Sequence, residues 1–83
     1  MEKVRLIKAI ERAGFGFAIC HGRLSEGVII SAEEWNDIEG YAADYWGEFR
    51  GNSPWIHPDL EVIAEDFGGY WEWENPGAIC FAE

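Results

Sequence analysis

Acidic residues recur at helical spacing in the middle of the chain, and their carboxylates are the side chains best placed to do chemistry. Carboxylates can transfer protons, bind a metal ion or present fixed negative charge. If residues 33–49 form a helix, four of them fall within about 60° of one another, at ~100° per residue. These four are Glu33, Asp37, Asp44 and Glu48. Because no Lys or Arg lies among them, we expect them to present uncompensated negative charge.

A second acidic group follows, and it continues into an aromatic segment in which Glu72 and Glu74 alternate with Trp71 and Trp73. The two groups would form one surface if the edge of a strand lies beside the helix. We therefore predict a partner-binding surface that comprises Glu33, Asp37, Asp44, Glu48, Asp59, Glu61, Glu65 and Asp66.

Charge is distributed very unevenly along the 83 residues. From Leu24 to Glu83 the chain has fourteen acidic residues and one basic residue, a formal charge of −13. The first 23 residues carry five basic and two acidic residues, a formal charge of +3. Such a field repels nucleic acid and anionic membranes and attracts basic surfaces. All five Trp lie in the acidic part, which excludes a disordered acidic tail, because such tails lack aromatic residues.

The elements that must position these carboxylates follow from hydrophobic periodicity and turn residues. Residues 2–13 read as a helix that ends at Gly14, and residues 15–31 as a β-hairpin. Ser31 and Glu34 form a capping box for a second helix, which extends to residue 49. A loop over residues 54–58 precedes strands over residues 60–64, 70–74 and 78–82, the last two joined by a type II turn at residues 75–77.

This order, α-β-β-α-β-β-β, predicts one α+β domain over residues 1–83. We expect an antiparallel sheet of four or five strands with the two helices on one face.

Aromatic residues at these spacings are expected to build the core. A stripe on the second helix would be buried, and it consists of Trp35, Ile38, Ala42, Tyr45 and Phe49. Trp71 and Trp73 share one face of a strand and are predicted to pack inside. Trp55 lies between prolines and would serve as an interface anchor. The alternative is a platform of Trp55, Trp71 and Trp73 that stacks a sugar or a peptide.

The remaining reactive residues predict no enzyme, no cofactor and no metal site. Cys20 and Cys80 lie in apolar surroundings and are expected to be reduced thiols, with a disulfide as the alternative. Together with His21 and His57 they match no zinc-ligand spacing. The sequence has neither a signal peptide nor an apolar run of membrane-spanning length, so we expect a protein of the bacterial cytoplasm.

Several segments resemble a unit of the ArdA-type antirestriction proteins. Ala18 to Cys20 and Leu24 to Ile30 match a strand–turn–strand with a Gly-containing turn, and Ile63 to Tyr70 approximates an Ile-x-Asp-aromatic-x-Gly-aromatic segment. The resemblance covers residues 17–70. It implies an acidic phage- or plasmid-carried protein that mimics bent DNA and blocks type I restriction–modification enzymes. Small phage anti-CRISPR proteins are similar in length and charge.

These observations lead to a first hypothesis and two alternatives. The first is a non-catalytic inhibitor of a CRISPR or restriction complex, a DNA mimic that occupies a basic nucleic-acid-binding surface and binds no nucleic acid or membrane itself. The second is an immunity or antitoxin protein that neutralises a basic toxin such as a nuclease. The third is a ligand-binding module built on Trp. Whether the chain forms a homodimer stays open.

Overall fold

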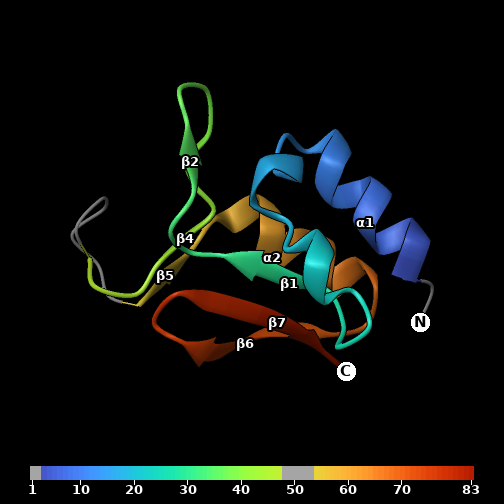
Figure 1. The fold of residues 1–83 in the computed structure, drawn as a ribbon. Helices are drawn as coiled ribbons and strands as arrows, with labels where there is room; N and C mark the ends of the chain where they lie inside the picture. Colours follow the sequence, from blue (N-terminus) through green and yellow to red (C-terminus); the bar gives the residue numbers. More distant parts are fainter. Residues whose placement is uncertain (1–2, 48–53) are drawn as a thin grey trace.

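The computed structural model describes residues 3–47 and 54–83 and has an α+β architecture (Figure 1). Two α-helices, two 3-10 helices and seven short strands make up the described chain. In order they are α1 (Lys3–Arg12), η1 (Gly16–Ala18), η2 (His21–Arg23), β1 (Ile29–Ser31), β2 (Trp35–Asn36), β3 (Gly40–Tyr41), β4 (Ala43–Asp44), β5 (Trp55–Ile56), α2 (Pro58–Asp66), β6 (Tyr70–Asn75) and β7 (Ala78–Ala82).

The main sheet is antiparallel and has the order β1-β7-β6. Its register pairs Trp71 with Phe81, Trp73 with Ile79, and Ile79 with Ile30. Because successive strand residues point to opposite faces, these five side chains line one face. That face packs against α1 and α2 through Leu6, Ile10, Leu60 and Ala64. These side chains form one hydrophobic core, and Trp73 packs partly buried against it.

The first helix and the C-terminal hairpin confirm the sequence prediction. Helix α1 buries Leu6 and Ile10, and Gly14 follows it with a φ of 97°, the left-handed conformation that ends many helices. The turn between β6 and β7 is not type II, however, because Gly77 is not among the glycines with positive φ. Asn75 Oδ1 instead accepts a hydrogen bond from Gly77 N at 2.8 Å, an Asx turn.

The hairpin predicted over residues 15–31 is wrong in its first half. Instead of a strand, the chain forms η1 and η2, and a single antiparallel bridge between Ile19 and Ile30 is what pairs the two halves. Phe15, Ala18 and Ile19 are all buried. Buried residues three and four positions apart are typical of helical turns, whereas a strand buries every second residue. Only β1 of the expected pair is a strand, and its partner is β7.

The helix predicted from the capping box at Ser31 is also wrong. The described part of this segment forms two-residue strands, with β2 paired to β3 and β4 paired to β5. Local hydrogen bonds compete with the helix here: Asn36 Oδ1 accepts from the backbone N–H groups of Ile38 and Glu39. Gly40 and Gly47 have φ of 73° and 78°, which breaks helical geometry. The predicted single sheet of four or five strands is therefore three small sheets.

The strand predicted over residues 60–64 is a helix, α2, and the loop predicted over residues 54–58 contains β5 and the start of this helix. Pro58 occupies the first helical turn, where its missing N–H costs nothing. His57 caps the helix through Nδ1, which accepts from Asp59 N at 3.1 Å. Asp59 and Glu61 lie in the first turn and interact favourably with the helix dipole.

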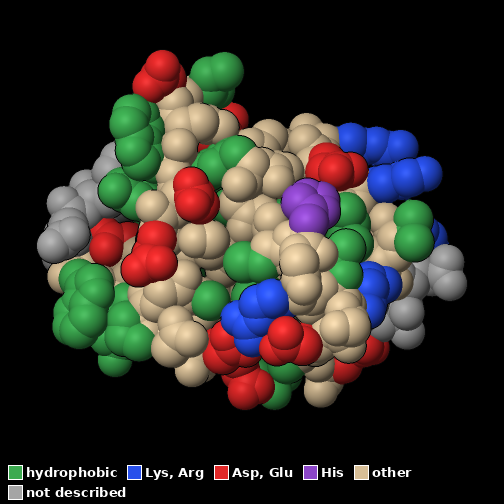
Figure 2. Space-filling view, in the orientation of Figure 1, with side chains coloured by type: hydrophobic (Ala, Val, Ile, Leu, Met, Phe, Trp, Pro, Cys, Tyr) green, Lys and Arg blue, Asp and Glu red, His purple; other side chains and the backbone are tan. Residues whose placement is uncertain are grey.

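Charged side chains are separated in space as they are in sequence. In Figure 2 most Lys and Arg side chains gather where α1 lies, whereas Asp and Glu side chains spread over the sheet and the β2–β3 hairpin. Neither α1 nor α2, the two α-helices of the described residues, is long and apolar enough to cross a membrane.

Candidate functional site

The solvent face of α2 is an acidic surface. Its buried face consists of Leu60 and Ala64, with Ile63 and Phe67 partly buried beside them. At ~100° per residue, the opposite arc holds one apolar side chain, Val62, and four exposed carboxylates. These four belong to Asp59, Glu61, Glu65 and Asp66.

Pro58–Asp66 contains no Lys or Arg, and no Lys or Arg among the described residues forms an ion pair with the four carboxylates of this acidic helix face. Helix α2 is held against the sheet by its buried residues and by Trp71, whose indole Nε1 donates to Leu60 O at 2.7 Å. Asp59 and Asp66 are separated by about 10 Å along the axis, at ~1.5 Å per residue. The carboxylates are therefore presented by a fixed backbone rather than by a mobile tail.

The predicted carboxylates outside α2 are dispersed, because the helix expected to align them does not form. Glu33 lies just after β1 and Asp37 in the β2–β3 turn, and both are exposed. Asp44 is buried in β4, with 7% of its surface exposed, and its Oδ1 accepts from Gly47 N at 3.0 Å. It is a turn residue and is not available to a partner. Glu48 lies outside the described residues.

Aromatic residues expected inside the molecule are partly on its surface. Trp35 is 58% exposed and Ile38 is 87% exposed, both on the projecting β2–β3 hairpin (Figure 1). Trp46 is 68% exposed and its ring meets Tyr45 edge-on at 5.1 Å. The stripe predicted for the second helix is thus wrong for Trp35 and Ile38, because there is no helix to bury them. Its member Ala42 is buried, and Tyr45 is half-buried. Phe49, the last residue of that stripe, lies outside the described residues.

The other tryptophans follow the prediction more closely. Trp71 is buried, and Trp73 packs partly buried against the same core, which confirms their assignment. Trp55 is half-buried in β5, with its ring 5.6 Å from that of His57. A stacking platform of Trp55, Trp71 and Trp73 is not supported, because Trp71 faces the core and its indole is bonded to Leu60 O.

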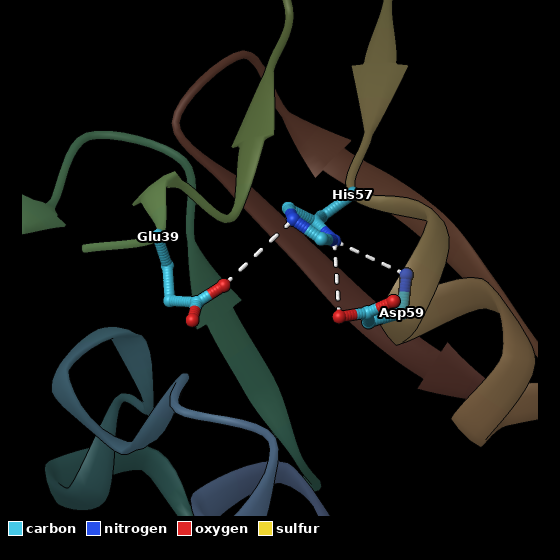
Figure 3. A group of neighbouring side chains, drawn as sticks. All are labelled: Glu39, His57 and Asp59. Carbon is cyan, nitrogen blue, oxygen red and sulfur yellow. Dashed lines mark hydrogen bonds and ion pairs between the residues drawn. The ribbon is translucent and has the colours of Figure 1, made fainter.

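The sequence prediction missed a group formed by Glu39, His57 and Asp59 (Figure 3). His57 Nε2 lies 4.0 Å from Glu39 Oε1, and Nδ1 lies 3.9 Å from Asp59 Oδ2. One imidazole and two carboxylates resemble a metal-ligand set. Nδ1 accepts the Asp59 N–H, so the neutral ring carries its proton on Nε2, and neither nitrogen offers a free lone pair. The geometry assigns His57 to capping α2 and to packing on Phe15, whose ring is 4.7 Å away.

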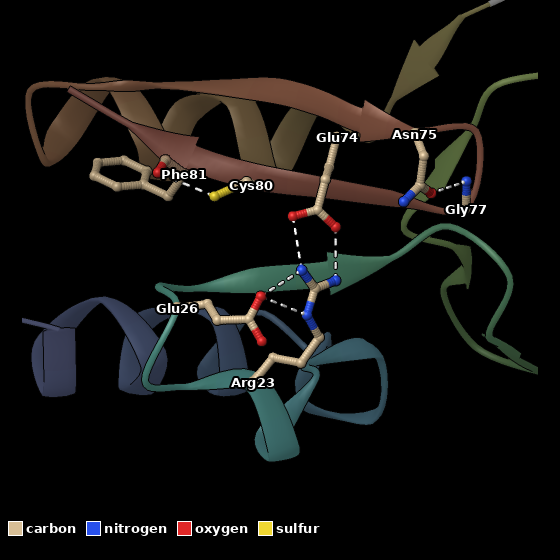
Figure 4. Close-up of polar contacts among 7 residues, drawn as sticks. All are labelled: Arg23, Glu26, Glu74, Asn75, Gly77, Cys80 and Phe81. Carbon is tan, nitrogen blue, oxygen red and sulfur yellow. Dashed lines mark hydrogen bonds and ion pairs between the residues drawn. The ribbon is translucent and has the colours of Figure 1, made fainter.

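A second polar group joins the η2 segment to the sheet (Figure 4). Arg23 donates to both carboxylate oxygens of Glu74 at 2.6 and 2.8 Å, and to Glu26 Oε1 from Nη2 at 2.8 Å. These hydrogen bonds lower the pKa of Glu26 and of Glu74 below their usual value and raise that of Arg23. Glu74 is therefore engaged within the molecule and is not part of a free acidic surface.

The two cysteines are free thiols and half-buried, as predicted. Burial raises the pKa of both Cys20 and Cys80, and carboxylates near them, above all Glu74, raise it further. Because the thiolate is the nucleophile and the metal-binding form, these residues are poorly suited to either role.

Comparison with known proteins leaves the acidic helix face as the main evidence on function. No protein-family model matches this chain, and no match was found among curated proteins or among solved structures.

Proposed function

We propose that this protein is a non-catalytic inhibitor that places the acidic helix face of α2 in a basic nucleic-acid-binding surface of a protein partner. The partner class suggested by the sequence resemblance is a bacterial phage-defence complex. The chain would act as a polyanion of fixed shape and would exclude nucleic acid by occupying the same cations.

The observation that carries this proposal is the density of fixed negative charge on α2. Four exposed carboxylates lie within about 10 Å along the helix axis, at ~1.5 Å per residue, as two pairs on edges about 130° apart. DNA likewise presents a dense array of negative charge to its binding proteins. Arg and Lys side chains that bind phosphates would also bind the carboxylates of Asp59, Glu61, Glu65 and Asp66. Glu33 and Asp37 add exposed charge outside α2.

Exposed apolar side chains favour a protein partner over solvation alone. Trp35, Ile38 and Trp46 are large exposed apolar side chains. Aromatic residues are enriched in interfaces, and Trp is enriched among hot spots. They equally favour the second candidate, neutralisation of a basic toxin such as a nuclease, since that contact would also combine apolar anchors with carboxylates.

The test compares two variants with the same change in net charge. Asp59→Asn, Glu61→Gln, Glu65→Gln and Asp66→Asn neutralise α2, whereas Glu11→Gln, Glu34→Gln, Glu72→Gln and Glu83→Gln neutralise exposed acids elsewhere. The partner is captured from a bacterial lysate at low salt, and displacement of labelled DNA from it is measured. Wild type and the second variant should displace DNA, and the α2 variant should not.

Two results would overturn the proposal. One is a captured partner that binds no nucleic acid, and the other is equal displacement by the α2 variant and by wild type. Circular dichroism is used to check that each variant is folded. Asp44→Lys is not used, because it would place an ammonium group at a buried position and destabilise the fold.

A further inference from the structure

A hollow of about 170 Å³ lies between α2 and the start of β6. The residues that line it come from β5, α2, the α2–β6 connection and β6: Ile56, Glu61, Ala64, Glu65, Gly69, Tyr70 and Trp71. Because water occupies about 30 Å³ per molecule in the liquid, the hollow has room for several waters or for one long side chain.

The floor of the hollow is apolar and rigid. Ala64 is 1% exposed and Trp71 is 9% exposed, and the Trp71 indole is fixed by its hydrogen bond to Leu60 O. Gly69 packs so closely that an added Cβ would lie 2.3 Å from Ala82 O. A ligand would therefore meet a preformed surface.

The rim carries two carboxylates and one aromatic ring. Glu61 and Glu65 are one helical turn apart, within about 40° of each other. Within residues 3–47 and 54–83, none of the ion pairs involves either of them. Tyr70 is 53% exposed beside them.

We propose that this hollow receives the side chain of an arginine from the basic partner. The apolar stem of Arg would lie on Ala64 and Trp71, as long cationic side chains do on apolar surfaces. Its guanidinium would bond the carboxylates of Glu61 and Glu65 through its fork of donors and stack on the Tyr70 ring. Lysine offers a compact ammonium without a planar face and fits this combination less well. The inference rests on the proposed function and specifies the residue that the acidic helix face recognises.

The test uses a small probe, N-acetyl-arginine amide, titrated into the full chain at low salt and followed by ¹H–¹⁵N NMR. Shifts should concentrate on Glu61, Glu65, Gly69, Tyr70 and the Trp71 indole N–H. N-acetyl-lysine amide should bind more weakly at the same place. Glu61→Gln with Glu65→Gln should weaken arginine binding about tenfold, since each exposed ion pair accounts for a factor of up to about five.

The matched control is Asp59→Asn with Asp66→Asn, which removes the same charge from the same helix on an edge about 130° away. It should leave binding of the arginine probe nearly unchanged. An equal loss in both double variants, or equal binding of the lysine probe, would overturn the proposal in favour of non-specific attraction. If the arginine probe binds but the protein does not displace DNA from the captured partner, the proposed function is refuted and the arginine specificity of the hollow is retained. If the variant with Glu61→Gln and Glu65→Gln still displaces DNA, the arginine site in the hollow is refuted and the proposed function is retained.

Discussion

At the scale of single residues, Arg23 has a role that its charge alone does not indicate. Among the described residues it is the one Lys or Arg that forms ion pairs, with Glu26 and with Glu74. The pair with Glu74 joins the η2 segment to β6, 51 residues further along the chain. Arg23 therefore links η2 to β6 and offsets the negative charge of Glu26 and Glu74.

Arg23→Gln should lower the melting temperature at neutral pH and make stability less dependent on pH. The hydrogen bonds from Arg23 hold the pKa of Glu26 and of Glu74 below 4.5 in the folded state. Their contribution is thus complete above pH 4.5 and is lost as the pH falls through the lowered values. Melting curves from pH 7 to pH 2.5 should show the gap between wild type and variant closing in the acid range.

Arg12→Gln is the control, because Arg12 is exposed and forms no ion pair within the described part of the chain. If the difference in melting temperature between wild type and Arg23→Gln stays constant down to pH 2.5, the ion pairs with Glu26 and Glu74 are not its cause.

At the scale of elements, the short connection from α2 to β6 positions the acidic helix face. Gly68 has a φ of 77°, and Gly69 N donates to Ala64 O at 2.9 Å, so the chain leaves the helix by a glycine-dependent turn. The turn also brings Tyr70 beside Glu65 in the hollow. The turn at Gly68 and Gly69 therefore fixes how α2 is oriented relative to β6.

Gly69→Ala should destabilise the protein by about 1–3 kcal/mol, the usual cost of overpacking. The added Cβ would lie 2.4 Å from Phe81 Cζ and 2.3 Å from Ala82 O, and the latter is backbone that cannot move freely. Gly22→Ala is the matched control, since nothing lies within 4 Å of its added Cβ; it should change stability by less than about 0.5 kcal/mol. Urea denaturation measures both, and equal effects would refute the close contact.

At the scale of the whole molecule, the charge distribution governs encounter with a partner. The net charge is −10. The cations gather over α1 (Figure 2), whereas α2 contains no Lys or Arg. A partner with a basic groove would be drawn in before contact, because long-range fields act mainly on the rate of association.

We predict that association with the captured partner slows at least about tenfold between low salt and ~0.5 M NaCl, where the Debye length falls to only a few ångströms. Lys8→Gln with Arg12→Gln, which makes the net charge more negative, should associate at least as fast as wild type. Stopped-flow or surface binding kinetics measure both rates. An association rate that does not depend on salt would contradict electrostatic steering.

The sequence by itself determined the features that depend on neighbouring residues or on composition. Leu6 and Ile10 on one stripe, followed by Gly14, predicted α1. Alternation from Tyr70 to Glu74, followed by Asn75-Pro76-Gly77, predicted the β6–β7 hairpin. The one-sided charge and the α+β class were also predictable, because they follow from residue counts and from the mixture of periodicities.

Tertiary structure decided the elements for which the local signals conflicted. A capping box at Ser31 favoured a helix, but Asn36, Gly40 and Gly47 offered turns that strand pairing with β3 and β5 completes. The segment from Leu60 to Ala64, apolar except for Glu61, fits a strand or a helix. The start at Pro58 and the hydrogen bond from Trp71 to Leu60 O favour the helix. Of the predicted acidic surface, the residues from Asp59 to Asp66 therefore lie together on α2, whereas Glu33, Asp37 and Asp44 are dispersed because the helix expected to align them does not form.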